Sequence, residues 1–460
     1  VQYILQKDYL EDHMALIDRK MDSRIFALAL PAIAEMMAHT LVWTADTAMV
    51  GRLTAADIAG VNLGVQIMFT LGNVMGAIGI GATALVARNI GAKDNERAEY
   101  IAGLAISLGI IVALVLGTLG IVFARSIFTA IVKDPEVIRI GSSYSRIVFT
   151  GTFFVIPLII SSSILRAAGN TVVPMISAMV ANAINIVGDY VLIFGKLGFP
   201  ALGADGAAIA TAASQAIGFF ICFAFLVKGT NGIKLRRKNM FNFKKESLGT
   251  LINLSMPAGM ETFMNEGSRL LSSFWIAQLG TIAFAANSLA VAAESLSFMP
   301  GNGFAVAAAA SVGQSLGAGD RDTAERIAKR SVTYAALLMG AVGLAFFFFP
   351  YNIMRVFSTD LASVAEASKA IRIGAFEQVP IAIGMVMSGA LKGAGDTKGP
   401  FRISLVTNFL FRLPLIFAIV FLINGNISYV WAATALQYGV EATLMVIRYS
   451  KGHWRRIDIR

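Results

Sequence analysis

The segment RNIGAKDNERAE at Arg88–Glu99 returns as QSLGAGDRDTAE at Gln314–Glu325. In the same way LRAAGNTVVP, from Leu165, returns as LKGAGDTKGP, from Leu391. The start positions 88 and 314, and 165 and 391, differ by the same 226 residues. The spacing also holds inside the apolar stretches, for Pro31 and Pro257, Glu35 and Glu261, and Asn182 and Asn408. The repeat therefore predicts two related lobes that are joined once.

The composition indicates a bilayer as the solvent. Hydrophobic residues make up 56% and charged residues 14% of the 460 positions, and the mean hydropathy is +0.70, too apolar for a soluble globule of this length. Apolar runs long enough to cross about 30 Å of hydrocarbon recur along the chain. They lie near 25–51, 58–87, 99–122, 138–163, 173–195 and 206–227, and near 250–279, 282–313, 327–349, 367–391, 403–423 and 428–449. We predict an all-α integral membrane protein with twelve transmembrane helices in two pseudo-symmetric six-helix bundles.

Basic residues gather in alternate loops and in the tail, whereas the intervening loops are nearly balanced in charge. By the positive-inside rule, both termini and the linker between the halves are cytoplasmic. The net charge of +10 is thereby explained without a nucleic-acid partner, because the basic residues are dispersed rather than gathered in one patch. No cleavable signal peptide is expected, since the first twenty residues are polar and mixed in charge, and Met14 is a candidate native start. This pattern fits a prokaryotic inner membrane.

The linker GTNGIKLRRKNMFNFKKES, within 229–248, is the one clear domain boundary, and we expect a short interfacial helix in it. The predicted organisation is an N-terminal cytoplasmic segment (1–23), a first lobe (24–228), the linker (229–248), a second lobe (249–449) and a basic cytoplasmic tail (450–460). Both repeat units start on the cytoplasmic side, so the lobes are related by an axis along the membrane normal. This plan favours a central cavity between rocking lobes.

Enzymatic chemistry finds no support in the residues. Cys222 is the single cysteine and lies in an apolar run, which excludes a disulfide within the chain and a Cys/His zinc site. No phosphate-binding loop or nucleotide fingerprint is present. We therefore expect no cofactor and no ATP-driven step by this chain alone, and the energy for transport has to come from an ion gradient or from the substrate.

Ionisable residues inside apolar runs are costly, so each is a functional candidate. Asp46 lies six residues before Arg52 at the outer end of its run, and Asp189 lies seven before Lys196, which places each about 9 to 10 Å below the outer face. Thr211 follows the outer end of the next run by a similar length. Asn185 precedes Asp189 by four residues and shares its helical face. Four polar residues of the first lobe are thus predicted to converge.

A carboxylate in such a low-dielectric layer is protonated more readily than in water, and a second carboxylate beside it strengthens this effect. Asn185 and Thr211 can hydrogen-bond either protonation state, or complete an oxygen cage for Na⁺ with Asp46 and Asp189. The structural alternative is that both aspartates are capped by a hydroxyl or backbone partner. The 226-residue offset places Ser272 and Leu415 opposite the two aspartates, so only the first lobe carries this set.

The other charged residues in apolar runs can be explained by structural roles. Glu266 and Arg269 are spaced to neutralise one another on one helix face, and Glu266 is also a candidate contact for substrate or cation. Glu35 and Glu261 lie near the expected starts of helices 1 and 7, where a carboxylate complements the helix dipole. The remaining charges are expected to pair across the second lobe or to act in gating; they are Glu294, Glu377, Arg412 and Glu441.

Three prolines interrupt apolar runs, at Pro157, Pro300 and Pro380. A proline inside a helix removes a backbone hydrogen bond and often kinks the helix. The stretch MPGNG at Met299–Gly303 is the best candidate for a hinge, with Pro300 at its centre. A static kink is the alternative.

The chain resembles the multidrug and toxic compound extrusion (MATE) transporters over about residues 24–448. The resemblance lies in the twelve-helix plan, the first-helix segment VWTADTAMVGRL, the LRAAGNT and LKGAGDT loops, and AINIVGDY on helix 5. It is most similar to the DinF branch, whose helix 1 aspartate, helix 5 asparagine and aspartate, and helix 6 threonine match Asp46, Asn185, Asp189 and Thr211. The NorM branch carries a second-lobe acid on helix 10, where this chain has Pro380 or Ile381.

The resemblance implies secondary active export of drug-like, often cationic and amphiphilic compounds in exchange for H⁺ or Na⁺, by a monomer. The missing helix 10 acid favours coupling through the first lobe, and H⁺ over Na⁺. One alternative is a lipid-linked oligosaccharide flippase of the same superfamily, for which a basic cavity and extra helices are usual. Another is a passive channel or a structural membrane protein.

Overall fold

The computed structural model describes residues 2–423 and 425–459, and for 2–17, 69–71 and 73 it describes the backbone alone, so Met14 lies outside the described side chains. The first lobe contains α1 (Gln2–Val50), α2 (Ala55–Met75), α3 (Ala77–Gly91), α4 (Asn95–Ile131), α5 (Pro135–Ala167), α6 (Val172–Phe194) and α7 (Ala204–Lys228). The second contains α8 (Lys245–Ala277), α9 (Thr281–Gly317), α10 (Arg321–Phe348), α11 (Pro350–Phe357), α12 (Leu361–Gly374), α13 (Gln378–Gly393), α14 (Lys398–Leu405), α15 (Leu413–Phe417) and α16 (Ile427–Ser450).

Helices occupy all twelve predicted runs, which confirms the all-α membrane fold. Within the described chain, ten segments are long and apolar enough to cross a membrane. The other two runs are the α2–α3 pair, which is interrupted at Gly76, and α8, which carries Glu261, Glu266 and Arg269 near its middle. Helix 10 consists of α12 and α13, and helix 11 extends from α14 to Leu422.

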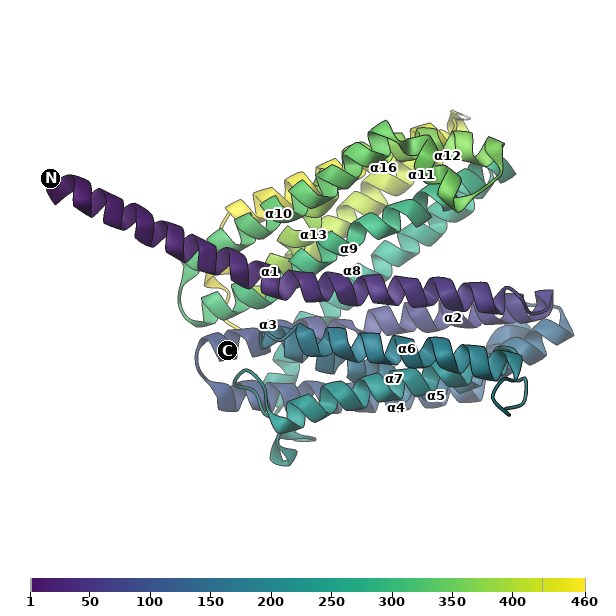
Figure 1. Cartoon of the computed structure of the whole chain (residues 1–460), viewed down its shortest axis with the longest axis horizontal. Helices are drawn as coiled ribbons and strands as arrows, with labels where there is room; N and C mark the ends of the chain where they lie inside the picture. Colours follow the sequence, from purple (N-terminus) through teal and green to yellow (C-terminus); the bar gives the residue numbers. More distant parts are fainter. Residues whose placement is uncertain (1, 424, 460) are drawn as a thin grey trace.

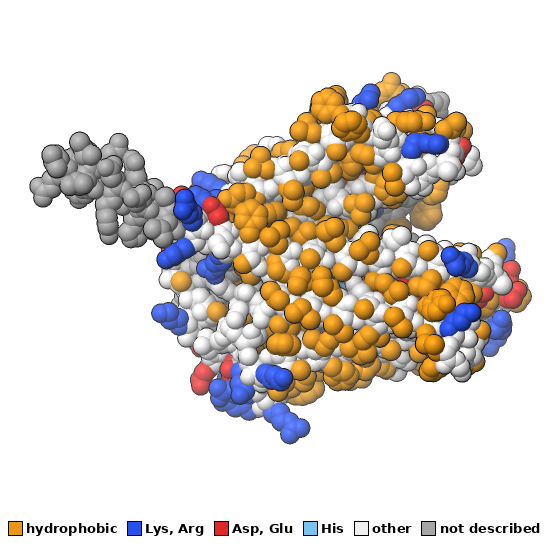
Figure 2. All heavy atoms as spheres, viewed as in Figure 1, with side chains coloured by type: hydrophobic (Ala, Val, Ile, Leu, Met, Phe, Trp, Pro, Cys, Tyr) orange, Lys and Arg blue, Asp and Glu red, His pale blue; other side chains and the backbone are white. Residues whose placement is uncertain are grey.

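The two lobes form a V (Figure 1). They meet at the end that carries both chain termini, where α3 packs on α8 and α9 and α1 packs on α9. At the opposite end, where α2 and α12 lie, they separate, and the space-filling view shows the same gap (Figure 2). Lysine and arginine gather at the two ends, with a broad hydrophobic surface between them (Figure 2). The molecule therefore opens toward one side only.

The lobes interlock through their first helices. Ile25 and Leu28 of α1 belong to the hydrophobic core of the second lobe, together with residues of α9, α10 and α13. Their repeat equivalents on α8, Leu251 and Leu254, belong to the core of the first lobe. The beginning of each repeat unit's first helix thus packs in the hydrophobic core of the other lobe. The pseudo-symmetry predicted from the sequence is therefore present in the packing.

The closest approach between the lobes is made by the motif that the sequence repeats. A Cβ atom on Gly91 would clash with the backbone carbonyl of Gln314, and one on Gly317 would clash with the carbonyl of Arg88. These four residues are related by the same offset, so the contact is symmetric. Only glycine permits such an approach of two backbones.

The same motif starts the helices that follow. The Asp94 carboxylate caps α4 by accepting from the Arg97 N–H at 3.0 Å, and Asp320 caps α10 by accepting from the Thr323 N–H at 2.9 Å. The residue before each cap has a positive φ, 61° at Lys93 and 81° at Gly319. The hydrogen bonds from Thr323 hold the pKa of the Asp320 carboxyl below its usual range. Each copy of the repeated sequence thus forms a tight turn between two helices, and these turns lie at the end where the lobes meet.

The helices are irregular at several positions, and the prolines in the sequence predict only some of them. Helices α5 and α9 continue through Pro157 and Pro300, so no break marks the expected hinge in α9. A 3₁₀ turn at Ala375–Glu377 separates α12 from α13 just before Pro380. Helix 11 contains two π-helical stretches, Val406–Arg412 and Ala418–Leu422. Such wide turns are rare and are frequent at functional sites.

The linker is fixed to the first lobe. Its predicted helix is a single 3₁₀ turn, Arg237–Asn239, and Arg236 forms an ion pair with Glu99 at 2.9 Å. The tail contacts both lobes, because Trp454 lies in the core of the second lobe and Ile459 in the core of the first. The linker and the tail therefore both stabilise the end at which the lobes meet.

We predict that Gly91→Ala or Gly317→Ala separates the lobes at this end. The added methyl meets backbone rather than a flexible side chain, and overpacking of this kind costs about 1–3 kcal/mol. Such a cost shifts a two-state equilibrium between about fivefold and more than a hundredfold. Spin labels at Phe199 and Val356, which are exposed on the open side of each lobe, should report a new, shorter distance population. Gly249→Ala is the control, because a Cβ there meets nothing within 4 Å. An unchanged distance distribution in both variants would contradict this role.

Candidate functional site

The four polar residues predicted in the first lobe lie together. Asp46 of α1 faces α6, which carries Asn185 and Asp189, and Thr211 comes from α7. Asn185 is 3% and Asp189 1% exposed, whereas Asp46 and Thr211 are half-buried. Gly188 allows this arrangement, because a Cβ there would lie 2.9 Å from Ala210 and would hold α6 and α7 apart.

Asn185 connects the two sides of this cluster. With its amide nitrogen toward α1, it donates to the Asp46 carboxylate at 3.0 and 3.3 Å. Its amide oxygen then lies 3.4 Å from the Thr211 hydroxyl and accepts from it. The opposite orientation would place the amide oxygen against the carboxylate, two acceptors in contact, and is therefore disfavoured.

The two aspartates also contact each other. Their carboxyl groups lie close enough to interact directly. No N–H or O–H group of the described residues donates to either oxygen of Asp189. Two ionised carboxylates repel one another at close range, so a proton or a cation between them would be favourable. Proton binding by this pair stays a prediction.

Tyr144 of α5 completes the cluster, and the sequence did not reveal it. Its ring is 4% exposed and acts electrostatically on both Asp46 and Asp189. It fits there because Gly64 of α2 has no side chain; a Cβ would lie 2.8 Å from the ring. A tyrosine in an apolar run gives no signal of its own, since only the packing of α2 on α5 brings it to the aspartates.

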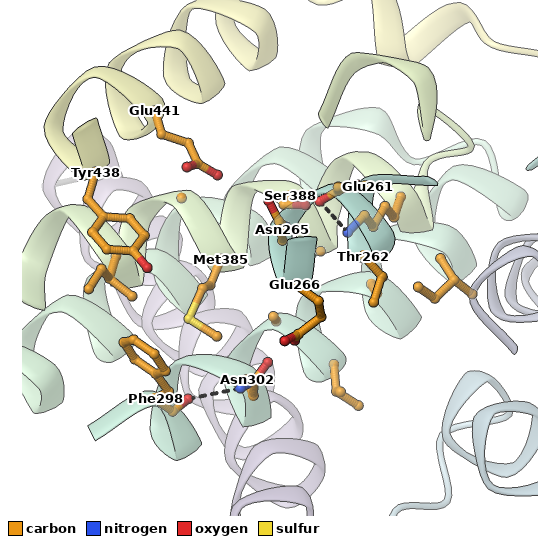
Figure 3. Close-up of a pocket in the computed structure, with 18 of the residues that line it drawn as sticks. Glu261, Thr262, Asn265, Glu266, Phe298, Asn302, Met385, Ser388, Tyr438 and Glu441 are labelled. Carbon is orange, nitrogen blue, oxygen red and sulfur yellow. Dashed lines mark hydrogen bonds and ion pairs between the residues drawn. The ribbon is translucent and has the colours of Figure 1, made fainter. Parts of the chain in front are cut away.

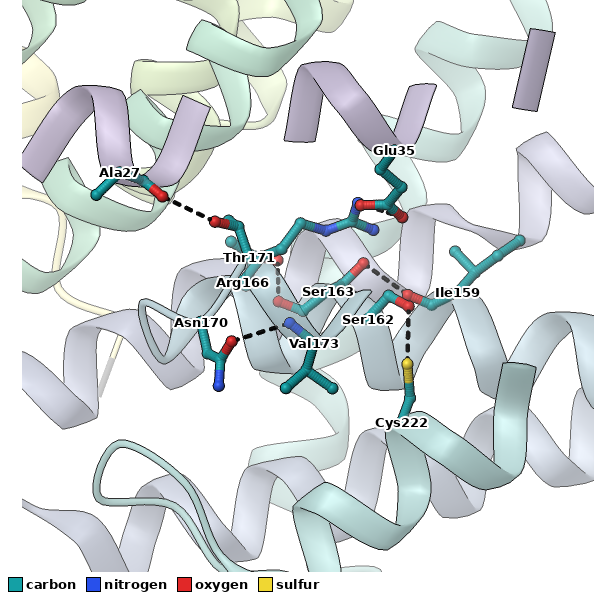
Figure 4. A network of polar contacts seen from close by, with 11 residues as sticks. Ala27, Glu35, Ile159, Ser162, Ser163, Arg166, Asn170, Thr171, Val173 and Cys222 are labelled. Atoms are coloured by element: carbon teal, nitrogen blue, oxygen red, sulfur yellow. Dashed lines mark hydrogen bonds and ion pairs between the residues drawn. The ribbon is translucent and has the colours of Figure 1, made fainter. Parts of the chain in front are cut away.

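Glu35 and Glu261 form ion pairs that the sequence analysis missed. Glu35 contacts Arg166 at 3.1 Å (Figure 4), and the repeat-related Glu261 contacts Lys392 at 2.9 Å. The expected helix-dipole role is wrong, because α1 begins at Gln2 and α8 at Lys245, far from either carboxylate. Each pair instead joins the first helix of its repeat unit to that unit's copy of the repeated loop motif, LRAAGNT in the first lobe or LKGAGDT in the second.

A cavity of about 560 Å³ lies between the lobes and is lined mainly by the second one. Figure 3 shows Glu266 and Asn302 pointing into it from α8 and α9, with Met385, Tyr438 and Glu441 on other walls. Glu266 thus lines the cavity, and its contact with a substrate or cation stays a prediction. Its expected ion pair with Arg269 is absent from the described part of the chain.

The remaining second-lobe charges form two groups. Glu441 is held by neutral donors, Gln437 at 2.6 Å, Thr407 at 3.4 Å and Ser404 at 3.5 Å. Glu294 and Glu377 contact each other, with Arg269 and Arg412 in electrostatic range. The expected pairing across the second lobe therefore does not include Glu441. Its charged neighbours are Glu261 and Lys392 instead.

Known proteins match this architecture. The MatE family model matches residues 31–191 and 257–418, two segments that start 226 residues apart. The chain belongs to the MatE family. MatE proteins are membrane transporters rather than enzymes, and the chain is accordingly a multi-pass membrane transporter.

Relatives extend this match over nearly the whole chain. A probable multidrug resistance protein NorM of Thermotoga maritima is 28% identical, covering 99% of this chain and 97% of its own. The probable multidrug resistance protein YoeA of Bacillus subtilis is 24% identical over 89% of both chains. An outward-facing MATE transporter of the MOP superfamily superposes with a TM-score of 0.87 at 21% identity, over 95% of this chain and 97% of that one. Membership in the DinF branch stays a prediction.

We predict that Arg166→Gln destabilises the protein more than the double change Glu35→Gln/Arg166→Gln. The single change leaves a buried carboxylate without its cation, which costs about 1–3 kcal/mol, whereas the double change removes both charges. Thermal unfolding of the detergent-solubilised protein measures the difference. The pair Lys392→Gln and Glu261→Gln/Lys392→Gln should repeat the pattern, and a double variant as unstable as the single one would contradict it.

Proposed function

We propose that this protein is a secondary active multidrug exporter that exchanges drug-like, often cationic amphiphilic compounds for H⁺ by alternating access. The observation that carries the proposal is the Asp46–Asp189 pair, which is placed to share a proton on the helix that spans the interface between the lobes. The names of the relatives, probable multidrug resistance proteins, support the substrate class. We also propose that the chain acts as a monomer, with its coupling site inside one lobe.

The predicted orientation of the chain in the membrane determines which side of the bilayer the open end of the V faces. With both termini on the cytoplasmic side of a prokaryotic inner membrane, as the loop charges predict, the lobes are closed toward the cytoplasm and open outward. The Asp46 layer then lies on the outer side, where protons enter under the usual gradient. In this state the protein can take up a proton from outside and release its substrate there.

The donor set favours H⁺ over Na⁺ at this site. Asn185 turns its amide nitrogen toward Asp46, so the N–H groups, rather than the amide oxygen, face the carboxylate. A sodium ion needs oxygen ligands, and an N–H donor at that place opposes it. Within the described residues, no three His, Cys, Asp or Glu side chains gather for a metal ion. Sodium binding by Asp46, Asn185, Asp189 and Thr211 would require rotation of the amide.

Protonation has a direct mechanical consequence for α1. When Asp46 is neutral, it no longer attracts the Asn185 N–H groups as a carboxylate does, because charge-assisted hydrogen bonds are roughly twice as strong as neutral ones. The contact between α1 and α6 weakens accordingly. Because the first part of α1 packs in the second lobe, a shift of this helix changes the contact between the lobes. Proton binding is thereby coupled to substrate release.

The flippase alternative is not favoured by the cavity. A lipid-linked oligosaccharide carries a diphosphate, for which a basic cavity is expected. Here the cavity wall carries carboxylates and cations in similar numbers. The carboxylates are Glu261, Glu266 and Glu441, and the cations are Arg166, Arg269, Lys392 and Arg412. Such a mixed wall suits compounds that are themselves cationic or zwitterionic.

We predict that Asp46→Asn abolishes proton-driven export while the protein still folds. The amide keeps the size of the side chain but cannot take up a proton, so the exchange cycle loses its driving step. Transport of a fluorescent cation into proteoliposomes with an imposed pH gradient measures the loss, expected to be tenfold or more. Asp134→Asn is the control, because Asp134 caps α5 at an exposed site and asparagine caps equally well.

The same preparation distinguishes the coupling ions and the passive alternative. Asp46→Asn transport at the wild-type rate would overturn the assignment of the proton site. Activity driven by a Na⁺ gradient alone, and lost in Asp46→Asn, would replace H⁺ by Na⁺ at the same residues. Transport that needs neither gradient would indicate a passive channel.

A further inference from the structure

Two arginines face the central cavity without a direct carboxylate partner. Arg269, on α8, is exposed there, and Arg412 is half-buried at the end of the π-helical stretch Val406–Arg412. No ion pair within 4.0 Å joins either guanidinium to a carboxylate in the described chain. The buried Nε of Arg412 has no hydrogen-bond acceptor. Guanidinium groups in a membrane interior normally have partners, so these two have unused binding capacity.

Their counter-charges lie behind the cavity wall. Glu294 is 7% and Glu377 0% exposed, and neither lines the cavity. Both carboxyl groups lie within electrostatic range of Arg412, and Glu294 also lies within range of Arg269. No N–H or O–H group of the described residues donates to Glu294 Oε1 or to either oxygen of Glu377.

The other cations of the cavity wall already have carboxylate partners. Arg166 pairs with Glu35, and Lys392 pairs with Glu261. Glu441 is already satisfied by Gln437, Thr407 and Ser404. Glu266 points into the cavity beside Asn302 (Figure 3), and no ion pair of the described residues includes it. One cavity thus presents two guanidinium groups and one carboxylate that have no direct ion pair.

We propose that Arg269 and Arg412 form a carboxylate-binding subsite for zwitterionic amphiphiles, with Glu266 receiving the cationic end of the same molecule. This assignment rests on the proposed export function and names its substrate class. The planar forks of guanidinium groups match a carboxylate in geometry and hold it by charge-assisted hydrogen bonds. The cavity volume of about 560 Å³ lies in the range that encloses a drug-sized molecule. Phe298 and Met385 supply apolar walls for the body of the ligand.

A purely structural charge network makes a different prediction. In such a network the arginines only compensate the buried Glu294 and Glu377, and the charge of a ligand has no effect on its binding.

The test uses two dyes that differ in one group, the cationic ester rhodamine 6G and the zwitterion made by hydrolysing its ethyl ester. Fluorescence polarisation of each dye with purified full-length protein measures binding without any ion gradient. The wild type should bind the zwitterion more tightly than the ester, and Arg412→Gln should weaken zwitterion binding about tenfold or more with little change for the ester. Arg372→Gln, an exposed arginine of the same lobe outside the cavity, is the control and should leave the ratio unchanged.

A second variant pair keeps the test decisive if Arg412→Gln does not fold. Arg269→Gln should lower the zwitterion-to-ester ratio in the same way, and Glu294→Gln/Glu377→Gln should raise it, because the arginines then face no carboxylate. Equal effects on both dyes in these variants, or an unchanged ratio, would overturn the subsite. Since no gradient is applied, this outcome is independent of Asp46: loss of the subsite with intact pH-driven transport refutes only the subsite. Intact dye selectivity with gradient-independent transport refutes only the export mechanism.

Discussion

The close approach of two backbones at Gly91 and Gly317 is the constraint on which the rest of the structure depends. Each glycine lies against a carbonyl of the other repeat unit, at Gln314 and Arg88, so the lobes touch without intervening side chains. This contact closes one end of the molecule, and the twelve helices then diverge toward the other end as a V. The cavity and the charged clusters of the two lobes lie in the part of the molecule where the helices diverge. A larger residue at either position would change the angle between the lobes, and with it the access to the cavity.

The duplication produced two equivalent scaffolds with different chemistry. The scaffold is symmetric down to single contacts: Glu35–Arg166 and Glu261–Lys392 are the same ion pair in two copies, and each unit lends the start of its first helix to the other core. The polar clusters are not symmetric. The first lobe holds a compact pair of aspartates next to an amide, whereas the second holds arginines, a buried glutamate pair and a mixed cavity wall. This difference supports the proposal that the first lobe binds the coupling ion and the second lobe binds the substrate.

Local sequence patterns were enough to predict the helices, but they did not predict which residues contact one another. Run length and hydropathy predicted all twelve crossings, and helical spacing placed Asn185 and Asp189 on one face. Yet Tyr144 has no sequence signal, because only the packing of α2 on α5 brings it to the aspartates. Arg166 and Glu35 are 131 residues apart, a separation at which no helical periodicity relates two residues. The π-helical turns of helix 11 were missed for a similar reason, since tertiary packing rather than local propensity selects them.

Hydropathy, repeat spacing and the cost of buried charge act locally along the chain. They were therefore enough to predict the solvent, the number of crossings, the duplication and the confinement of Asp46 and Asp189 to one lobe. The packing of the helices settled which charges meet. It joined Asp46 to Asp189, turned Asn185 toward α1, separated Glu441 from Glu294 and Glu377, and left Arg269 and Arg412 facing the cavity. The physical reason is that electrostatic interactions and hydrogen bonds depend on distances of a few ångströms between helices, which are set by close packing of the whole molecule.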